Sequence, residues 1–342
     1  MARAQECVDR ARLVPIWTNG PQLTHIHELR DTAMTRKIRF GATLAPSVSA
    51  KQWRERVAAL EDSPFDVLLV NDHLSGLRYA PMVALAAAAQ LTDRIRLGVL
   101  VLANDYRHPA VLAKEAATLD LLSGGRLELG MGAGWMRSDY DSAGIAFDSP
   151  RVRLARLREG VRIVREAWKS GQSDFTGEFY TATGLDHAPL PVQDGGPPLL
   201  LGGGGPQMLR FAAREGDIVN VTTRTAIDGR GVAPDDVGLE PLLRKLELVH
   251  DAAKEADREV EISVGIRAVA IEDRLSELHP TLGNHLDAMR PTPFIMEGSV
   301  ESVAEKILLW HELHNVSYFV LANDSDVEKM IPVVQRVKEQ NR

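Results

Sequence analysis

The 342-residue chain has the composition of a globular protein, with 44% hydrophobic and 25% charged residues. Its net charge of −7 at pH 7 supplies no basic field for nucleic acid or an anionic membrane surface. The single cysteine, Cys7, excludes an intrachain disulfide and a cysteine metal cluster, and it fits a reducing cytoplasm. No apolar run approaches the length of a membrane span. The ten histidines have no HExxH-like spacing, so we expect no metal site.

Residues 1–36 mix Arg, Pro, Gly and His without a sustained hydrophobic period. One interpretation is a regulatory or interface arm. The other, which we favour, is a poorly ordered N-terminal extension ahead of a true start at Met34. We therefore expect residues 37–342 to form the single folded domain.

From Ile38 onward, short apolar runs alternate with segments of helical period. The predicted strands are Ile38–Leu44, Val67–Val70, Ile95–Ala103, Arg126–Gly132, Leu199–Leu201, Ile218–Val221, Ile262–Ile271 and Tyr318–Leu321. The predicted helices include Ser49–Leu60, Pro81–Leu91, Pro206–Arg214, Leu239–Ala256, Val300–His311 and Val327–Lys338, with two more beginning at Pro109 and Pro150. Continuous apolar strands are typical of a buried parallel sheet.

Eight such alternations predict a (β/α)8 TIM barrel with insertion segments near 171–198 and 272–293. A doubly wound open sheet is the alternative, although no GxGxxG follows the first strand. There is also no GxSxG elbow, and Cys7 lies outside the predicted fold, so we expect no covalent nucleophile.

Asp72-His73 directly follows the second predicted strand, where a barrel carries its chemistry. His73 could exchange a proton with a bound ring while Asp72 fixes the local geometry. Alternatively, His73 is a loop residue that caps nearby backbone. The end of the third strand, 100–104, is apolar and could support a cofactor.

Four glycines, Gly202 to Gly205, stand between a predicted strand and a helix. Backbone amides of such a run can converge on an anion, and the helix N-terminus adds a favourable dipole. We interpret the run as a phosphate site and expect at least one of the four to have φ > 0. A tightly packed turn is the alternative.

These segments, with RLGVLVLANDYRHP and LDLLSGGRLELGMGAGW, resemble the luciferase-like monooxygenase superfamily. More narrowly, they are similar to its deazaflavin (coenzyme F-420)-dependent oxidoreductases. The resemblance implies a barrel that is often dimeric, with a flavin-like ring across the C-terminal ends of the strands. It also implies a non-prolyl cis peptide at Leu100-Val101 that backs the ring.

By the same resemblance, His73 is the candidate catalytic residue. The candidate cofactor-binding residues are Asp72, His73, Leu100, Val101, Ala103, Gly132, Ala133, Gly134, Trp135, Gly202, Gly203, Gly204 and Gly205. Sugar-phosphate dehydrogenases of this type carry a Glu after the fourth strand, where this chain has Ala133. That departure counts against glucose-6-phosphate dehydrogenase activity.

The resulting hypothesis is a cytoplasmic, homodimeric oxidoreductase that transfers a hydride between coenzyme F-420 and a small organic substrate. A reduced-FMN-dependent monooxygenase that uses O2 and a separate flavin reductase is the first alternative. A non-catalytic flavin-binding barrel is the second. The substrate is expected to contact the two insertion segments.

Overall fold

The computed structural model describes residues 36–46, 49–226, 231–275 and 285–341. Lys37–Arg342 form one compact unit. Almost all of the predicted N-terminal extension, residues 1–35, lies outside the described residues, so that prediction remains untested.

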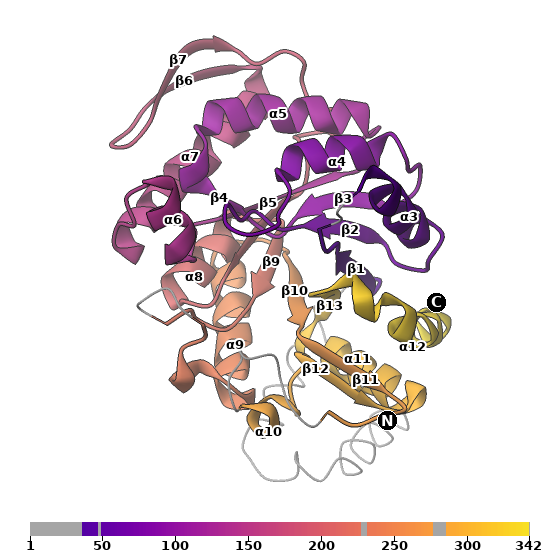
Figure 1. The fold of residues 1–342 in the computed structure, drawn as a ribbon. Coiled ribbons are helices and arrows are strands. Elements are labelled where there is room, and N and C mark those ends of the chain that lie inside the picture. The colour runs from indigo at the N-terminus through magenta and orange to yellow at the C-terminus, as the bar shows by residue number, and fades with distance from the viewer. Residues whose placement is uncertain (1–35, 47–48, 227–230, 276–284, 342) are drawn as a thin grey trace. The chain divides into compact units, whose positions relative to one another are not determined.

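Parallel strands form a closed barrel at the centre of this unit (Figure 1). Its strands are β1 (Arg39–Thr43), β2 (Val67–Val70), β3 (Arg96–Val99), β4 (Leu102–Ala103), β5 (Leu127–Gly132), β8 (Leu199–Gly203), β9 (Ile218–Val221), β10 (Glu261–Ile266) and β13 (Val316–Leu321). They follow the order β3-β2-β1-β13-β10-β9-β8-β5-β4, and β3 also pairs with β5. The pairing of β3 with β5 closes the ring, in which β3 and β4 together occupy the place of one strand. It confirms the predicted (β/α)8 barrel and excludes the open sheet.

The helices surround the strands, as Figure 1 shows. They are α3 (Ala50–Glu61), α4 (Pro81–Ala89), α5 (Pro109–Leu122), α7 (Pro150–Ser170), α8 (Pro206–Glu215), α9 (Leu239–Glu255), α11 (Val300–His314) and α12 (Val327–Gln340). Their starts follow local chemistry. The Ser49, Ser149 and Ser299 side chains accept hydrogen bonds from first-turn amides of α3, α7 and α11. Proline occupies the first turn of α4, α5, α7 and α8.

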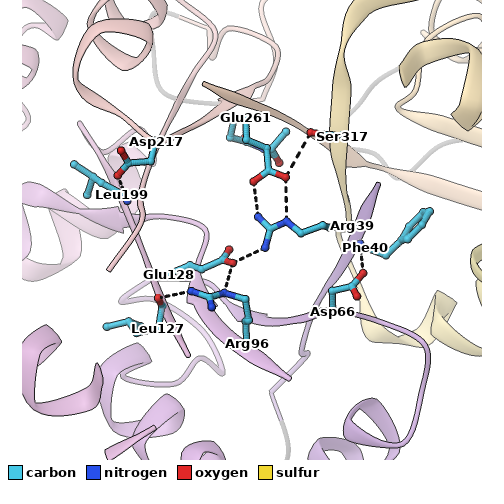
Figure 2. Close-up of polar contacts among 12 residues, drawn as sticks. Arg39, Phe40, Asp66, Arg96, Leu127, Glu128, Leu199, Asp217, Glu261 and Ser317 are labelled. Atoms are coloured by element: carbon cyan, nitrogen blue, oxygen red, sulfur yellow. Dashed lines mark hydrogen bonds and ion pairs between the residues drawn. The ribbon is translucent and has the colours of Figure 1, made fainter. Parts of the chain in front are cut away.

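Charged side chains cross the barrel interior at the N-terminal ends of the strands (Figure 2). Arg39 contacts Glu128 at 2.5 Å and Glu261 at 2.6 Å, and Arg96 donates to Glu128 at 2.6 Å. Burial alone would lower the pKa of Arg39, but Glu128 and Glu261 outweigh it and raise that pKa. Since both carboxylates are buried, removal of either arginine would leave an uncompensated charge. This network of Arg39, Arg96, Glu128 and Glu261 fills the barrel at the N-terminal ends of its strands.

Apolar side chains fill the next level of the interior, among them Leu69, Leu200 and Val320. Glycines then replace larger residues toward the C-terminal ends of the strands. Gly202 and Gly265 face that end with no atom closer than 3.3 Å to an added Cβ. The interior is therefore filled by large side chains toward the N-terminal ends of the strands and has small residues toward the C-terminal ends, where barrels of this kind bind their ligands.

Two insertions and one extra helix depart from the strand–helix repeat. Strands β6 (Gln172–Thr176) and β7 (Thr181–Asp186) form an antiparallel hairpin within the predicted 171–198 insertion. Strands β11 (Ala268–Ile271) and β12 (Ile295–Gly298) form a small parallel sheet, with α10 (Leu286–Met289) between them in sequence. Helix α6 (Arg137–Ala143) follows β5 and has no counterpart among the predicted helices.

Two predicted strands were wrong in their extent. The predicted strand 95–103 is interrupted at Leu100-Val101 and becomes β3 and β4. The predicted strand 262–271 breaks at Arg267, because the backbone turns away from β13 and its amide donates to Phe294 instead. The first run has one polar residue, Arg96, and the second has two, Ser263 and Arg267, so hydrophobicity alone does not reveal the break.

Candidate active site

The wall of the barrel mouth is built around the interruption between β3 and β4. The peptide bond Leu100-Val101 is cis, which confirms the prediction drawn from the family resemblance. Both side chains are half-buried and pack on the barrel core. The Val101 methyl groups lie over the backbone of Gly130, Gly132 and Gly202, where an added Cβ would come within 3.2, 2.6 and 3.6 Å. Val101 therefore forms a flat apolar shelf above three glycines of β5 and β8.

Asp72 ties β2 to the β3–β4 side of the mouth. Its carboxylate accepts a hydrogen bond from the Ala103 amide at 3.0 Å and binds Arg107 through two hydrogen bonds of 3.0 and 3.2 Å. Asp72 and Ala103 are both buried. A bidentate pair of this kind fixes orientation as well as charge. Asp72 and Ala103, both predicted site residues, therefore hold the strands of the mouth together, and their polar atoms are used in these internal hydrogen bonds.

His73 is held by Asp139 of α6, the helix that follows β5. Its Nδ1 lies 2.8 Å from the Asp139 carboxylate, which also accepts hydrogen bonds from the Ser75 amide at 3.0 Å and from the Ser75 hydroxyl. Burial would raise the pKa of Asp139, but the hydrogen bonds from Ser75 and His73 outweigh burial and lower it. Asp139 is therefore an anionic acceptor for a proton on His73 Nδ1, and Nε2 is the ring nitrogen outside this contact.

The loop after β5 places an aromatic side chain beside this histidine. The rings of His73 and Trp135 meet edge to face with centroids 5.7 Å apart, and Trp135 is 41% exposed. Gly134 has φ +74°, and an added Cβ would lie 1.9 Å from the Tyr140 hydroxyl. Gly134 therefore lets the loop lie on Tyr140 while it presents Trp135 to solvent. Gly132 and Ala133 connect this loop to β5.

A second polar network beneath the loop was missed by sequence reasoning. Asp105 accepts hydrogen bonds of 3.0 Å from both the Tyr140 hydroxyl and Arg156. Burial raises the pKa of Asp105, even though Arg156 and Tyr140 act in the opposite sense. The arginines of α7 are typical of a solvated or subunit-facing surface, yet Arg156 pairs with this buried carboxylate and Arg153 is itself buried against Phe147. Spacing along α7 could not identify partners on another strand's loop.

The glycines at the end of β8, Gly202 to Gly205, are needed for a different structural reason from the one that we predicted. None of Gly202 to Gly205 has a positive φ, so that expectation was wrong. Gly204 is required because the backbone of residues 222–224 lies 2.4 to 2.7 Å from the position of an added Cβ. Gly205 has open space around it and begins α8, which no side chain of the described residues caps. A free helix N-terminus with close backbone access is a suitable anion site.

The described residues contain no group of three or more His, Cys, Asp or Glu side chains that could hold a metal ion. Among those same residues, no helix is long and apolar enough to cross a membrane.

The protein is a closed (β/α)8 barrel of the ligand-binding class. At the C-terminal ends of its strands it has an apolar shelf, a histidine held by a carboxylate and an uncapped helix N-terminus. Comparison with known proteins narrows that class. Residues 33–290 match the model of the luciferase-like monooxygenase family. The chain therefore belongs to this family.

Among curated relatives, the chain is similar to an F-420-dependent glucose-6-phosphate dehydrogenase of Mycobacterium avium. The two are 35% identical over 182 residues, a segment that covers 51% of this chain and 53% of that protein. It is 32% identical over 230 residues to the enzyme of that name from Mycolicibacterium gilvum, covering 64% and 66%. The chain thus spans about half to two thirds of these relatives. The coenzyme F-420-dependent tetrahydromethanopterin reductase of Methanopyrus kandleri has the same fold, with a TM-score of 0.71, 20% identity and coverage of 90% and 100%.

Proposed function

We propose that this protein is an oxidoreductase that transfers a hydride between coenzyme F-420 and a small organic substrate. The observation that carries the proposal is the shelf of Val101 over Gly130, Gly132 and Gly202, with His73 and Trp135 at the same end of the barrel. The similarity to relatives named as F-420-dependent enzymes supports the choice of cofactor.

The residues of the mouth fit a planar ring with a charged tail. An apolar shelf backed by glycines accepts a flat ring, and Gly265 leaves further space, since only Arg267 Nε, at 3.8 Å, lies within 4 Å of an added Cβ there. A phosphate on the tail would bind at Gly205 and the first turn of α8, where amides are open and uncapped. When bound, the deazaflavin supplies the hydride chemistry.

The chain's own residues would bind, orient and handle a proton. Val101 and Leu100 support one face of the ring, and Trp135 limits access from solvent. His73 presents Nε2 to the mouth because Asp139 holds Nδ1. That nitrogen can accept or return the proton that accompanies hydride transfer at a substrate oxygen. Asp72 keeps β2 and β4 in register through Arg107 and the Ala103 amide.

Equilibrium binding and oxygen uptake test this function. Purified protein is titrated with F-420 and with FMN, each oxidised and reduced, with fluorescence as the readout. We expect tight F-420 binding without oxygen consumption, and hydride transfer with a panel of alcohols, ketones and enones. Oxygen uptake with reduced FMN would instead favour the two-component monooxygenase, which needs a separate reductase. Binding without turnover of any substrate would favour a non-catalytic barrel.

Glucose-6-phosphate belongs in the same substrate panel. We expect poor turnover, since the resemblance places Ala133 where sugar-phosphate dehydrogenases carry a Glu. Turnover equal to that of the best substrate would contradict this expectation and would assign the activity of the curated relatives to this chain.

The protein is further proposed to act as a homodimer in the reducing cytoplasm, in keeping with its single cysteine. The outer faces of α4 and α5 support the dimer. Val83, Val111 and Leu122 are 72%, 54% and 51% exposed, and a surface hollow of about 620 Å³ runs along these helices and β7. Contiguous exposed apolar side chains are typical of a protein–protein interface. A second copy of this chain is the proposed occupant.

A further inference from the structure

Arg267 lies where the chain leaves the barrel, yet its side chain remains beside the barrel strands. Its backbone amide donates to the Phe294 carbonyl at 2.7 Å, which directs the chain into β11. Its Nη2 donates to the Thr222 hydroxyl at 2.6 Å. Its Nε is the only atom within 4 Å of an added Cβ on Gly265, at 3.8 Å. The guanidinium therefore lies next to open space at the C-terminal ends of β9 and β10.

The charge of Arg267 is not balanced by any described residue. No carboxylate of the described residues forms an ion pair with Arg267. Within the same residues, its guanidinium hydrogen-bonds to one side chain, the Thr222 hydroxyl. By contrast, Arg107 pairs with Asp72, and Arg224 pairs with Asp235 and Asp236. In agreement, burial lowers the pKa of Arg267 and no anion opposes the shift. Arg267 is half-buried, so its guanidinium is partly desolvated and has no carboxylate partner among the described residues, which leaves its charge available to a ligand oxyanion.

Arg267 also adjoins the glycine run that follows β8. The amide of Thr222 donates to the Gly203 carbonyl at 3.2 Å, and Gly204 packs on the backbone of residues 222–224. Strands β8, β9 and β10 are consecutive in the barrel. The uncapped first turn of α8, the Thr222 hydroxyl and the Arg267 guanidinium therefore belong to the same side of the mouth, formed by β8, β9 and β10.

We propose that Arg267 and Thr222 form an oxyanion subsite on this side of the mouth, which binds a phosphate or carboxylate group. Guanidinium binds such groups through two parallel hydrogen bonds, and Nη2 is already oriented by Thr222. The oxyanion has two sources, the acidic tail of the cofactor or an anionic substrate. The subsite deepens the proposed function, but its first test requires no deazaflavin.

That test measures the melting temperature of the full chain with and without inorganic pyrophosphate, at constant ionic strength. A saturating ligand that binds only the folded protein raises its stability, so we expect a rise of about 2 °C or more for the wild type. Arg267→Met and Arg267→Gln should abolish the rise. Without ligand, both variants should melt close to the wild type, because no ion pair to a described residue is lost. Arg224→Met is the matched control, a compensated arginine two residues from Thr222, and it should keep the rise.

Two results overturn the proposal. One is a pyrophosphate effect that persists in both Arg267 variants. The other is a large fall in the ligand-free melting temperature of both, which would mean that Arg267 is an internally paired structural residue.

Titration with F-420 and with its phosphate-free riboside distinguishes the two sources. If Arg267→Met weakens F-420 about 10-fold or more and spares the riboside, the cofactor supplies the oxyanion. If both bind normally while the pyrophosphate effect is lost, an anionic substrate supplies it. Equal weakening of both ligands overturns the oxyanion assignment. If the wild type binds no deazaflavin but keeps an Arg267-dependent pyrophosphate effect, the subsite stands and the proposed function fails.

Discussion

His73 and Asp139 show how a buried carboxylate can orient a half-buried neighbour. His73 is 16% exposed at its side chain, whereas Asp139 is fully buried. Asp139 cannot donate while it is anionic, so it keeps a proton on His73 Nδ1 and leaves Nε2 outside this contact. Asp139 is 66 residues away in the sequence, on a helix whose short polar sequence gives no amphipathic signal.

Replacement of these two residues should separate chemistry from binding. His73→Ala should lower kcat about 10²-fold or more, the usual scale for a general acid or base, and change F-420 affinity only a few-fold. Asp139→Asn keeps the size of the side chain but permits the other tautomer. We expect an intermediate loss of kcat and a displaced pH–rate profile, with little change in KM. Steady-state kinetics from pH 5 to 9 provides the check, and unchanged turnover in His73→Ala would remove it from the mechanism.

At the scale of one element, the glycine run before α8 combines two requirements. Gly204 is needed because the backbone of residues 222–224 packs against it. Gly205 has no such neighbour, so its role is to let a ligand approach the amides of α8. Gly205 has φ −86° and ψ 146°, which any residue adopts. The two neighbouring positions therefore offer a matched pair.

We expect Gly204→Val to unfold at a clearly lower temperature, because the backbone of residues 222–224 leaves no room for Cβ. Gly205→Val should keep the melting temperature and weaken F-420 by roughly 1–3 kcal/mol, the scale of one or two lost hydrogen bonds to a charged group. It should spare the phosphate-free riboside. If Gly205→Val weakens both ligands equally, the phosphate assignment is wrong. If Gly204→Val is fully stable, the packing argument fails.

Helix α11 ends in a half-buried histidine, His314, that should make stability depend on pH. Burial, with a smaller contribution from His250, lowers the pKa of His314 from 6.5 to about 4. Burial also lowers the pKa of His311 and His250. A base with a lowered folded-state pKa binds fewer protons in the folded chain than in the unfolded chain. Its stabilisation is therefore complete above pH 6.5 and falls as pH decreases toward 4.

For His314 alone, this difference amounts to about 2 kcal/mol between pH 7 and pH 5. Denaturant unfolding at these two values should show that His314→Gln loses less stability on acidification than the wild type, by about that amount. Equal losses in the two proteins would indicate that His314 titrates in the folded state as it does in the unfolded chain.

At the scale of the whole molecule, the exposed faces of α4 and α5 should decide the oligomeric state. Light scattering after size exclusion should give a mass twice the 37.6 kDa of the chain. Val111→Glu places a charge in the apolar face and should shift the protein to monomer, since a buried unpaired charge is costly. Gln335→Glu adds the same charge to an exposed position on α12 and should remain dimeric. A wild type that is monomeric at all concentrations would refute the interface.

The alternation of strands and helices was available from the sequence, because its signals are local. Ser49, Pro109 and Pro150 begin or cap helices through contacts within one turn. Apolar runs identify buried strands wherever both faces are covered. The family resemblance added the cis bond at Leu100-Val101, which no local propensity predicts.

Only the tertiary structure decided which polar groups meet. Arg39 is 222 residues from Glu261, and Asp105 is 51 residues from Arg156. Such pairs depend on barrel closure, since neighbouring strands bring together side chains that no sequence period relates. The break of the seventh strand at Arg267 and the close packing of Gly204 likewise depend on backbone from other strands. Local chemistry thus determined the elements, and closure of the barrel determined the site, because the hydrogen bonds of Asp72, His73 and Asp105 join segments that follow different strands.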